Sequence, residues 1–510
     1  MGNIVSYPSE KSKHKISEMM RMELTSTRND QLRCGGYEAI FRGIAPDGGL
    51  YAPTAFPALS LEETSDLSYA ALTERILARF LPGVSQADLE AACGAAYPAR
   101  FDTPAVCPLK KAGESYVLEL FHGETAAFKD MALSVMPSLL AASRRALGVQ
   151  DIVLILTATS GDTGSAAMNG FRDLPGTAAL ILYPRDGVSE IQRRQMTAMP
   201  GANVAACAVD SNFDDCQRAV KQAFLHLAPP AGIRFSSANS INIARLTPQI
   251  AYYYAAYHAL VREHGLAKGT PVTFVVPTGN FGDILAGLYA REMGLPVAHL
   301  VCASNANRVL TDFLATGVYD ARRTLARTLS PSMDILISSN LERLLFHAEA
   351  GNSRPVRESM QELAENGVYR VSDAALGRIQ RVFRAYAYTD ADTLDVMGRT
   401  FRTTGYLPDP HTAIAFAAAE AYRRENPGVP CVCLATASPF KFPQSGLRAL
   451  SLPERGSAFD MQDALSAAIH VPVPRALASL RGRAPVHTDE VTVRSIPEYI
   501  LKKAATVCKA

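Results

Sequence analysis

Several features are missing from this 510-residue chain, and each absence excludes a class of function. Neither sign of charge is in excess, because 51 Lys and Arg residues against 49 Asp and Glu residues give a formal net charge of +2. Dedicated nucleic-acid binders usually carry a clear basic excess. No apolar run approaches the roughly 18 residues that a membrane-spanning helix needs. Tryptophan, a common anchor for sugars and methylammonium groups, is absent. We therefore expect no nucleic acid and no membrane among the partners.

Clustered cysteines are also missing. The nine cysteines are dispersed, and no two of them form a C-x-x-C pair. An odd, scattered set in a long chain is typical of reduced intracellular thiols rather than of a disulfide framework. Without clustered Cys or His, and without an H-E-x-x-H motif, we expect no metal site. The N-terminus lacks the charged-then-apolar profile of a secretory signal, so we predict a cytoplasmic protein.

Residues 1–21 are polar, rich in Lys and Ser, and predicted to be a flexible leader. The first six residues fit the N-myristoylation pattern, with Gly2 as the acceptor. Single matches to this pattern are common, and one acyl chain anchors a protein only weakly. A plain leader is therefore the preferred interpretation.

The rest of the chain changes character near residue 117. Before it, residues 61–81 and 86–96 show helical periodicity, with a Gly- and Pro-rich loop at 45–53, which indicates a mainly helical N-terminal region. After it, short apolar strands alternate with amphipathic helices, as in βαβ units with parallel sheets. Two α/β blocks divide naturally near residue 245. We expect an active site between them, where loops leave the carboxyl ends of strands.

One loop of this kind contains Lys129, which follows Phe128 and is flanked by apolar residues on both sides. A lysine held in an apolar cleft has its ammonium form disfavoured, so its free amine can act as a nucleophile or base. A surface lysine at the start of a helix is the alternative, and local sequence alone favours that alternative.

A second loop follows the strand at 152–156 and consists of small and polar residues: Ser160, Gly161, Asp162, Thr163 and Gly164. Small residues allow backbone N–H groups to approach a ligand, and with the N-terminus of the next helix they form a cradle for an anion. A tight turn with Asp162 as a helix cap is the structural alternative.

A third loop follows the strand at 272–276 and has the same design: Gly279, Asn280, Phe281, Gly282 and Asp283. It lacks the Lys-Ser/Thr of a nucleotide P-loop and the G-x-G-x-x-G spacing, which argues against ATP and NAD. A fourth feature, Thr436 after the strand at 431–434, offers a neutral hydroxyl that suits a pyridine nitrogen. Two anion cradles and a reactive lysine together suit pyridoxal phosphate (PLP) joined to an amino acid.

Beyond single loops, the chain resembles the threonine synthase family of fold-type II PLP enzymes. The matching segments are ordered along nearly the whole sequence, and the longest are Phe121–Leu133, Gly43–Pro53, Ser160–Ala167, Tyr183–Gln195, Ser240–Arg245, Pro277–Asp283, Ser332–Arg343 and Leu434–Pro443. The resemblance implies an α/β fold of the tryptophan synthase β type. Its expected parts are an N-terminal region (22–105), a small mobile α/β domain (129–244), and a large α/β domain (106–128 and 245–510) with an insertion at about 320–400.

The resemblance also implies a role for each matching residue. Lys129 is expected to form the Schiff base with PLP and to shuttle protons, with Phe128, Asp162 and Thr436 also contacting the cofactor. The cofactor phosphate is expected in the loop of Gly279, Asn280, Phe281, Gly282 and Asp283. The substrate carboxylate is expected at Ser160, Gly161, Thr163 and Gly164, and the weaker candidates for the substrate phosphate are Asn242, Arg245 and Arg28.

The implied reaction converts O-phospho-L-homoserine and water to L-threonine and phosphate by γ-elimination followed by addition of water at Cβ. One departure matters: Glu124 stands where the family commonly has proline. A carboxylate facing the site would repel a phosphorylated substrate, so a related phospho-lyase that releases 2-oxobutyrate and ammonia stays open. A non-catalytic PLP-binding protein is the alternative of a different class. The expected assembly is a monomer or a homodimer.

Overall fold

The computed structural model describes residues 23–509. The N-terminal region contains three helices, α2 (Gly36–Arg42), α3 (Tyr69–Phe80) and α4 (Gln86–Ala96). The helix predicted at 61–81 begins only at Tyr69, because the Ser68 side chain accepts a hydrogen bond from Ala71 N–H and caps it there. A small antiparallel sheet lies beside these helices and was not predicted, since its strands are very short: β1 (Leu24–Ser26), β2 (Arg33–Cys34) and β3 (Tyr51–Pro53). The predicted leader and Gly2 lie outside the described residues.

The larger of the two main sheets has six strands in the order β14-β11-β10-β15-β5-β4. All but the edge strand β4 are parallel to their neighbours. Strands covered on both faces are apolar along their whole length, and all six residues of β10 are buried accordingly. The strands are β4 (Leu109–Ala112), β5 (Ser115–Glu119), β10 (Val272–Pro277), β11 (Val297–Ser304), β14 (Phe383–Ala387) and β15 (Cys431–Ala435).

Helices cover both faces of this larger sheet, and each face packs into its own core. On one face lie α11 (Ile250–His264), α12 (Gly282–Glu292), α13 (Val309–Thr316) and α16 (Asp373–Val382). On the other lie α17 (Asp390–Thr404), α18 (Pro410–Glu425), α19 (Pro443–Ala449) and α20 (Ala458–Ile469).

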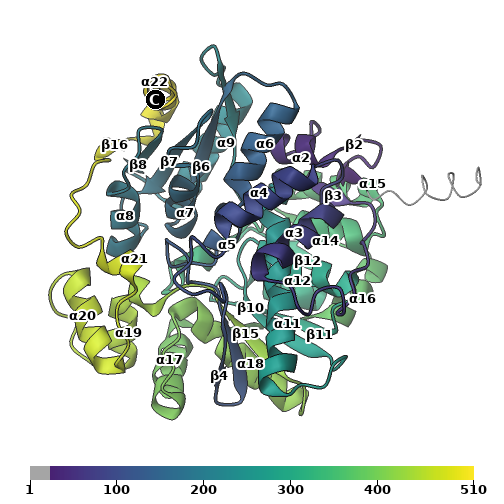
Figure 1. The fold of residues 1–510 in the computed structure, drawn as a ribbon, viewed down its shortest axis with the longest axis vertical. Coiled ribbons are helices and arrows are strands. Elements are labelled where there is room, and N and C mark those ends of the chain that lie inside the picture. The colour runs from purple at the N-terminus through teal and green to yellow at the C-terminus, as the bar shows by residue number, and fades with distance from the viewer. Residues whose placement is uncertain (1–22, 510) are drawn as a thin grey trace, which may run out of the picture.

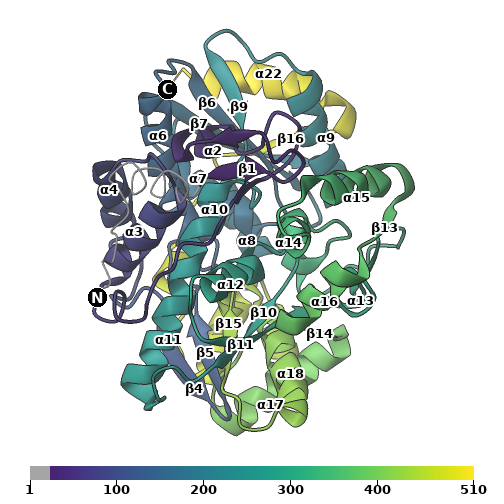
Figure 2. The same ribbon diagram turned by 90° about the vertical axis from the view of Figure 1, so that its right-hand side faces the viewer.

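The smaller sheet has five parallel strands in the order β16-β8-β7-β6-β9. One face packs against α9 (Phe213–His226) and α22 (Ile496–Val507), the other against α6 (Met136–Ala146) and α7 (Asp162–Phe171). In Figures 1 and 2 this sheet lies above the larger one. Its strands are β6 (Ile152–Ala158), β7 (Thr177–Pro184), β8 (Val204–Val209), β9 (Ile233–Ser236) and β16 (Asp489–Val491).

The sheet topology departs from the predicted domain ranges in two places. Strand β16 and helix α22, which we assigned to the large domain, belong to the smaller sheet. Strand β14 lies in the segment expected to be a helical insertion, yet it forms an edge of the larger sheet. Both strands are edge strands with charged residues, so neither has the apolar run that marked the central strands. The other domain ranges stay a prediction.

The fold places the loops of interest together. The loops meet where four strands end: β5, β10 and β15 of the larger sheet and β6 of the smaller one. Sites in parallel sheets lie at the carboxyl ends of the strands, as these loops do. All nine cysteines are free thiols, and eight of them are buried. Among residues 23–509, no helix combines the length and the apolar character that crossing a membrane demands.

Candidate active site

Lys129 is held between the ends of two neighbouring strands. The chain leaves β5 and runs to Phe128, whose N–H donates to the carbonyl of Thr436 at 2.8 Å, and Ala127 pairs with Ala437. Lys129 then begins the short helix α5 (Asp130–Leu133). The structure therefore brings Thr436 next to Phe128 and Lys129, which lie more than 300 residues earlier in the sequence.

The Lys129 ammonium lies in a buried, charged environment. Its Nζ is 3.6 Å from Asp162 Oδ2 and 4.7 Å from the centre of the Phe128 ring. Burial lowers the pKa of Lys129, and the neighbouring Lys441 and Arg245 add to this, while Asp162 opposes it. The net direction is down, which favours the free amine needed for imine formation and proton transfer.

Asp162 stands at the centre of a buried polar network. Its Oδ1 accepts from Lys441 Nζ at 2.6 Å and from Gln192 Nε2 at 2.8 Å, and Ser332 Oγ donates to its Oδ2 at 3.2 Å. Burial alone would raise the pKa of Asp162, but Lys441 and Lys129 lower it by more. The carboxylate therefore stays ionised between two lysines.

Lys441 is the residue that sequence reasoning missed. It is completely buried, and its Nζ also donates to the carbonyl of Thr125 at 2.9 Å. A lysine between Phe440 and Phe442, directly after the loop of Thr436, was the available signal. Ser332 was missed as well: besides bonding Asp162, its N–H donates to His411 Nε2 at 3.2 Å.

The loop at 160–164 forms the N-terminus of α7. Gly161 has a φ of 130°, and a Cβ there would lie 2.4 Å from the Gln192 side chain, so only glycine fits. Two of its N–H groups, those of Gly161 and Gly164, already donate to Thr159 Oγ1 at 3.0 and 2.9 Å. Thr159, another residue that sequence reasoning missed, therefore shapes the loop. Ser160 and Thr163 lie beside it at the helix start.

The loop at 279–283 forms the N-terminus of α12 and is surrounded by neutral donors. Phe281 adopts the left-handed conformation, with φ at 61°, and turns the chain into the helix. Ser338 Oγ donates to the Gly279 carbonyl at 2.8 Å, and Asn340 Nδ2 donates to the Asn280 carbonyl at 3.1 Å. A Cβ on Gly279 would lie 3.0 Å from a carbonyl oxygen. The Ser338 and Asn340 side chains fix the loop through its carbonyl groups, and the backbone N–H groups at the start of α12 suit a phosphate group.

The Asp283 side chain points away from this loop. Its Oδ1 accepts hydrogen bonds from Tyr252 at 2.5 Å and Tyr253 at 3.1 Å. Burial raises the pKa of Asp283 to about 6, although the two tyrosines act against the rise. This orientation keeps its charge off the anion cradle, to which Asp283 contributes through the backbone of the first helical turn.

The three candidates for the substrate phosphate differ in availability. Arg28 donates through Nε and Nη2 to both oxygens of Glu342, at 2.9 and 2.8 Å. The Asn242 side chain caps the short helix α10 (Ile243–Leu246) and is completely buried. Arg245 is buried close to Lys129, and its Nε has no hydrogen-bond partner among the described residues. Of the three, Arg245 alone lies in the lysine environment with a donor to spare.

Glu124 lies outside this cluster. Its Oε2 accepts from Arg100 Nε at 2.6 Å and from Asn169 Nδ2 at 2.7 Å, and its side chain is 40% exposed. Because Arg100 neutralises the carboxylate, Glu124 does not bring a free negative charge to the lysine site.

His122 lies in the segment that leads to Lys129, and its surroundings lead us to expect that the stability of the fold depends on pH. Burial lowers its pKa, but hydrogen bonds to Glu119 and Asp102 raise it by more, so the net direction is up. The pKa of His122 is thus higher in the folded protein than in the unfolded chain, where it is about 6.5. The protonated ring stabilises the fold fully at pH values below the unfolded-state pKa. This stabilisation is lost as the pH rises through the folded-state pKa. In denaturant titrations we expect the unfolding free energy to fall as the pH rises above about 6.5. The fall should be smaller in His122→Gln, and an equal fall in both proteins would contradict the assignment.

The residues present fit pyridoxal phosphate. A buried lysine with a lowered pKa, a neutral cradle at the start of α12 and a hydroxyl at Thr436 match its aldehyde, its phosphate and its pyridine nitrogen. Among residues 23–509, no cluster of three or more His, Cys, Asp or Glu side chains is arranged to hold a metal ion.

The fold and this site define a pyridoxal-phosphate-dependent enzyme of fold type II, and the family described as "Pyridoxal-phosphate dependent enzyme" matches residues 107–437. Families described as "Threonine synthase N terminus" and "Threonine synthase, C-terminal" match residues 23–97 and 412–484. The chain belongs to the threonine synthase family.

Individual relatives agree with this assignment. The chain is 42% identical over 429 residues to the threonine synthase of Pseudomonas aeruginosa. This match covers 83% of this chain and 89% of that protein. It is 38% identical over 436 residues to threonine synthase-like 1 of Homo sapiens, covering 82% of this chain and 58% of that protein. The crystal structure of PLP-bound threonine synthase from Brucella melitensis superposes with a TM-score of 0.84 at 36% identity, covering 96% of this chain and all of that one. The predicted family, fold class and cofactor are thereby confirmed.

Proposed function

We propose that this protein converts O-phospho-L-homoserine and water to L-threonine and phosphate. The observation that carries the proposal is the buried Lys129, which faces Asp162 and lies between two anion cradles on a threonine synthase fold. A carboxylate cradle on one side and a phosphate cradle on the other match an amino acid bound to a phosphorylated cofactor.

When bound, pyridoxal phosphate supplies an electron sink that stabilises negative charge on the substrate carbons. In the proposal, Lys129, Phe128 and Thr436 hold its ring, and the loop at 279–283 holds its phosphate. Asp162 lies beside Lys129 and would face the substituents of a ring held there. No metal takes part in this scheme.

Lys129 moves the protons. Its Nζ is proposed to take the proton from the substrate Cα and to return a proton when the product forms. A lowered pKa serves this role, because an ammonium form cannot accept a proton. Asp162 keeps Nζ in place from 3.6 Å without taking its proton, since the low pKa of Asp162 keeps the carboxylate ionised.

The substrate is proposed to bind through both of its acidic ends. The backbone of residues 160–164, at the N-terminus of α7, receives the carboxylate. Among Arg28, Asn242 and Arg245, the unpartnered Nε supports Arg245 as the phosphate ligand nearest the lysine. Arg28 requires a rearrangement of its Glu342 pair before it can take part.

Water must be limited during the reaction, because an open cleft lets the reactive intermediate hydrolyse to a keto acid. Several hydrogen bonds already join the two sheets' loops across the site, among them Ser332 Oγ to Asp162 at 3.2 Å and Ser189 Oγ to the Lys441 carbonyl at 3.2 Å. We propose that the smaller domain closes over the substrate through such contacts, in a cytoplasmic monomer or homodimer.

The proposal is tested by turnover of O-phosphohomoserine with both products measured. Threonine and phosphate in equal amounts support it. Production of 2-oxobutyrate and ammonia instead would show the phospho-lyase. Borohydride reduction of the holoenzyme followed by peptide mapping tests both enzyme readings, because each requires a labelled peptide containing Lys129. The absence of that peptide would contradict both, and a labelled peptide without turnover of O-phosphohomoserine would support the non-catalytic alternative.

Glu124 gives a specific prediction within this test. Because its carboxylate is bound by Arg100 and Asn169, we expect Glu124→Gln to change kcat/KM by less than about threefold, within the range of neutral surface changes. The ratio of threonine to 2-oxobutyrate should stay the same. A rise in either product of ten times or more would show that the carboxylate acts on the substrate after all.

A further inference from the structure

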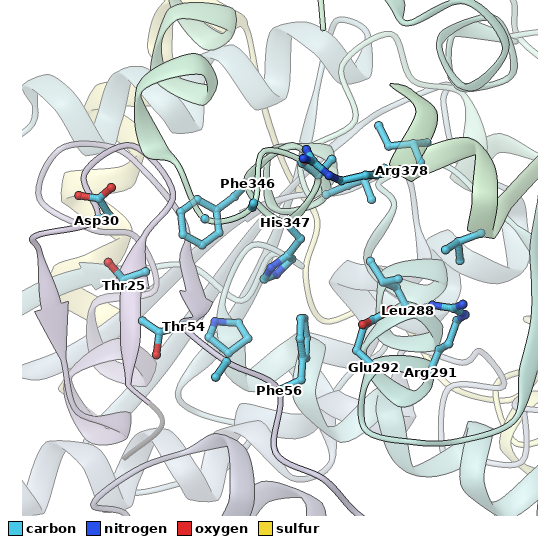
Figure 3. Close-up of a pocket in the computed structure, with 18 of the residues that line it drawn as sticks. Thr25, Asp30, Thr54, Phe56, Leu288, Arg291, Glu292, Phe346, His347 and Arg378 are labelled. Carbon is cyan, nitrogen blue, oxygen red and sulfur yellow. Dashed lines mark hydrogen bonds and ion pairs between the residues drawn. The ribbon is translucent and has the colours of Figure 1, made fainter. Parts of the chain in front are cut away.

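A cavity of about 810 Å³ lies away from the lysine site and has no part in the proposed reaction. It opens between the N-terminal strands, the C-terminal ends of α12 and α14 (Leu341–Ala348), and helix α16. Figure 3 shows its labelled side chains converging from these elements. Its volume is within the range of small-molecule sites, which is about 300–1,000 Å³.

One wall of the cavity is aromatic and uncharged. The Phe56 ring lies 4.9 Å from the His347 ring and 5.0 Å from the Tyr289 ring, centre to centre. Burial, with Arg343 nearby, lowers the pKa of His347 to about 3, so its ring is neutral at physiological pH. In Figure 3, Phe56, Phe346 and His347 lie around the middle of the cavity. The Phe56 ring is inclined by 51° to the His347 ring and by 70° to the Tyr289 ring, so a planar group can pack against one ring face and meet the edge of another.

The rim carries more positive than negative charge. Four arginines line the cavity (Arg33, Arg291, Arg378 and Arg381), against the carboxylates of Asp30 and Glu292. Arg33 is paired with Glu23, outside the lining, so the excess positive charge rests on Arg378 and Arg381. Arg291 is paired with Glu292 through Nη1, but its Nε is buried without a hydrogen-bond partner among the described residues. Arg378 uses one nitrogen to donate to the Ala348 carbonyl at 2.6 Å. Guanidinium groups with free donors suit carboxylate or phosphate.

Two helices connect this cavity to the cofactor cradle. Helix α12 begins at Gly282 in the cradle and ends at Glu292 on the cavity. Helix α14 follows Asn340, which donates to Asn280 in the cradle, and ends at Ala348 on the cavity. At 1.5 Å per residue, the eleven residues of α12 separate the two sites by roughly 16 Å. The two helices therefore form a continuous structural connection between the cavity and the cradle.

We propose that this cavity is a second ligand site, that it takes a small anion carrying a planar ring, and that its occupancy is coupled to the cofactor cradle through α12 and α14. The ring stacks on the wall of Phe56 and His347, and the anionic group pairs with Arg378, Arg381 and Arg291.

The absence of tryptophan provides a clean probe of binding. In Phe56→Trp the introduced indole is the sole tryptophan and reports on the cavity. We expect phenyl phosphate and benzoate to change its fluorescence, and inorganic phosphate to bind at least about tenfold more weakly because it lacks the ring. Comparing the two aromatic probes distinguishes a phosphate from a carboxylate ligand. Calorimetry on the wild-type holoenzyme repeats the titration if Phe56→Trp fails to fold. No binding of either aromatic probe at millimolar concentration would overturn the proposal.

Arginine variants show whether binding occurs in this cavity. Arg378→Gln combined with Arg381→Gln should weaken phenyl phosphate binding at least about tenfold, since two guanidinium groups are lost. The matched control is Arg354→Gln, an arginine that is 76% exposed on α15 (Ser353–Asn366) and lies outside the cavity. Equal binding by the double variant and the control would place the probe elsewhere and overturn the proposal.

Coupling is measured by titrating phenyl phosphate into the holoenzyme and into protein stripped of its cofactor. Because coupling between two sites is reciprocal, phenyl phosphate must bind the holoenzyme and the stripped protein with different dissociation constants if the sites are coupled. A coupling of typical size corresponds to a difference of about fivefold or more. Equal constants would overturn the coupling. This readout needs no turnover, so its failure is distinguishable from failure of the proposed reaction.

Discussion

Lys129→Ala is expected to lower threonine formation by roughly 10⁴-fold, to near background. One side chain is proposed both to hold the cofactor and to move the substrate proton, so its removal takes away both roles at once. The buried position, 3.6 Å from Asp162, offers no second amine that could approach the substrate without rearrangement, because Lys441 is bonded to Asp162 and Thr125.

The measurement is single-turnover production of threonine by purified variant and wild type. Lys268→Ala serves as the matched control, since that lysine is 49% exposed and paired with Glu62 on the surface. Loss of the absorbance of the bound cofactor imine should accompany the loss of activity. Retention of more than about a hundredth of the wild-type rate would show that the proton is moved by another group.

Asp162→Asn is expected to lower both stability and activity. Asp162 is the carboxylate between two buried lysines, and its side chain is 3% exposed. Removing one partner from a buried charge network typically costs about 3–5 kcal/mol, because the remaining charges lose their compensation. We therefore expect a lower unfolding midpoint, together with a fall in kcat as Lys129 loses the group that holds it.

A double-mutant cycle separates the two effects. Lys441→Met removes one buried ammonium, so Asp162→Asn should cost less in the Lys441→Met background than in wild type. Asp186→Asn, at a carboxylate that is 78% exposed, is the control for the same chemical change. Additive changes in unfolding free energy would contradict the network, because groups that contact one another at 2.6 Å must couple.

Much of the site could be predicted from local sequence. The loops at 160–164 and 279–283 each follow an apolar strand and precede a helix, and parallel strands carry such loops to one edge. For Lys129 the local pattern favoured a surface position, and only the resemblance to the family indicated the Schiff base. Glycine is required at 161, where a Cβ would lie 2.4 Å from Gln192, and it relieves a tight approach at 279. Small residues of this kind are the local signal by which the two loops could be recognised as cradles. The central strands were predicted for a similar reason, since strands covered on both faces are apolar throughout.

Other features depended on contacts between distant segments. Strands β14 and β16 owe their place to pairing at sheet edges, which leaves little pattern in the sequence. Arg28 was a candidate phosphate ligand by residue type, yet its partner Glu342 lies more than 300 positions away. From the sequence, the Glu124 carboxylate could repel a phosphorylated substrate, but in the folded chain it is bound by Arg100 and Asn169.

By itself, then, the sequence determined the family and the cofactor, because ordered matches to the threonine synthase family along nearly the whole chain can be recognised without any contact in space. The same resemblance, and not the local pattern, indicated Lys129 as the reactive lysine. Only the tertiary structure decided the charge state around that lysine. It places Lys441 and Asp162 in contact at 2.6 Å, 279 positions apart. Burial lowers the pKa of Lys129 although Asp162 opposes the change, whereas burial alone would raise the pKa of Asp162, which Lys441 and Lys129 lower by more. Electrostatic effects of this kind depend on distance in space and on burial, and neither is recorded in the order of residues.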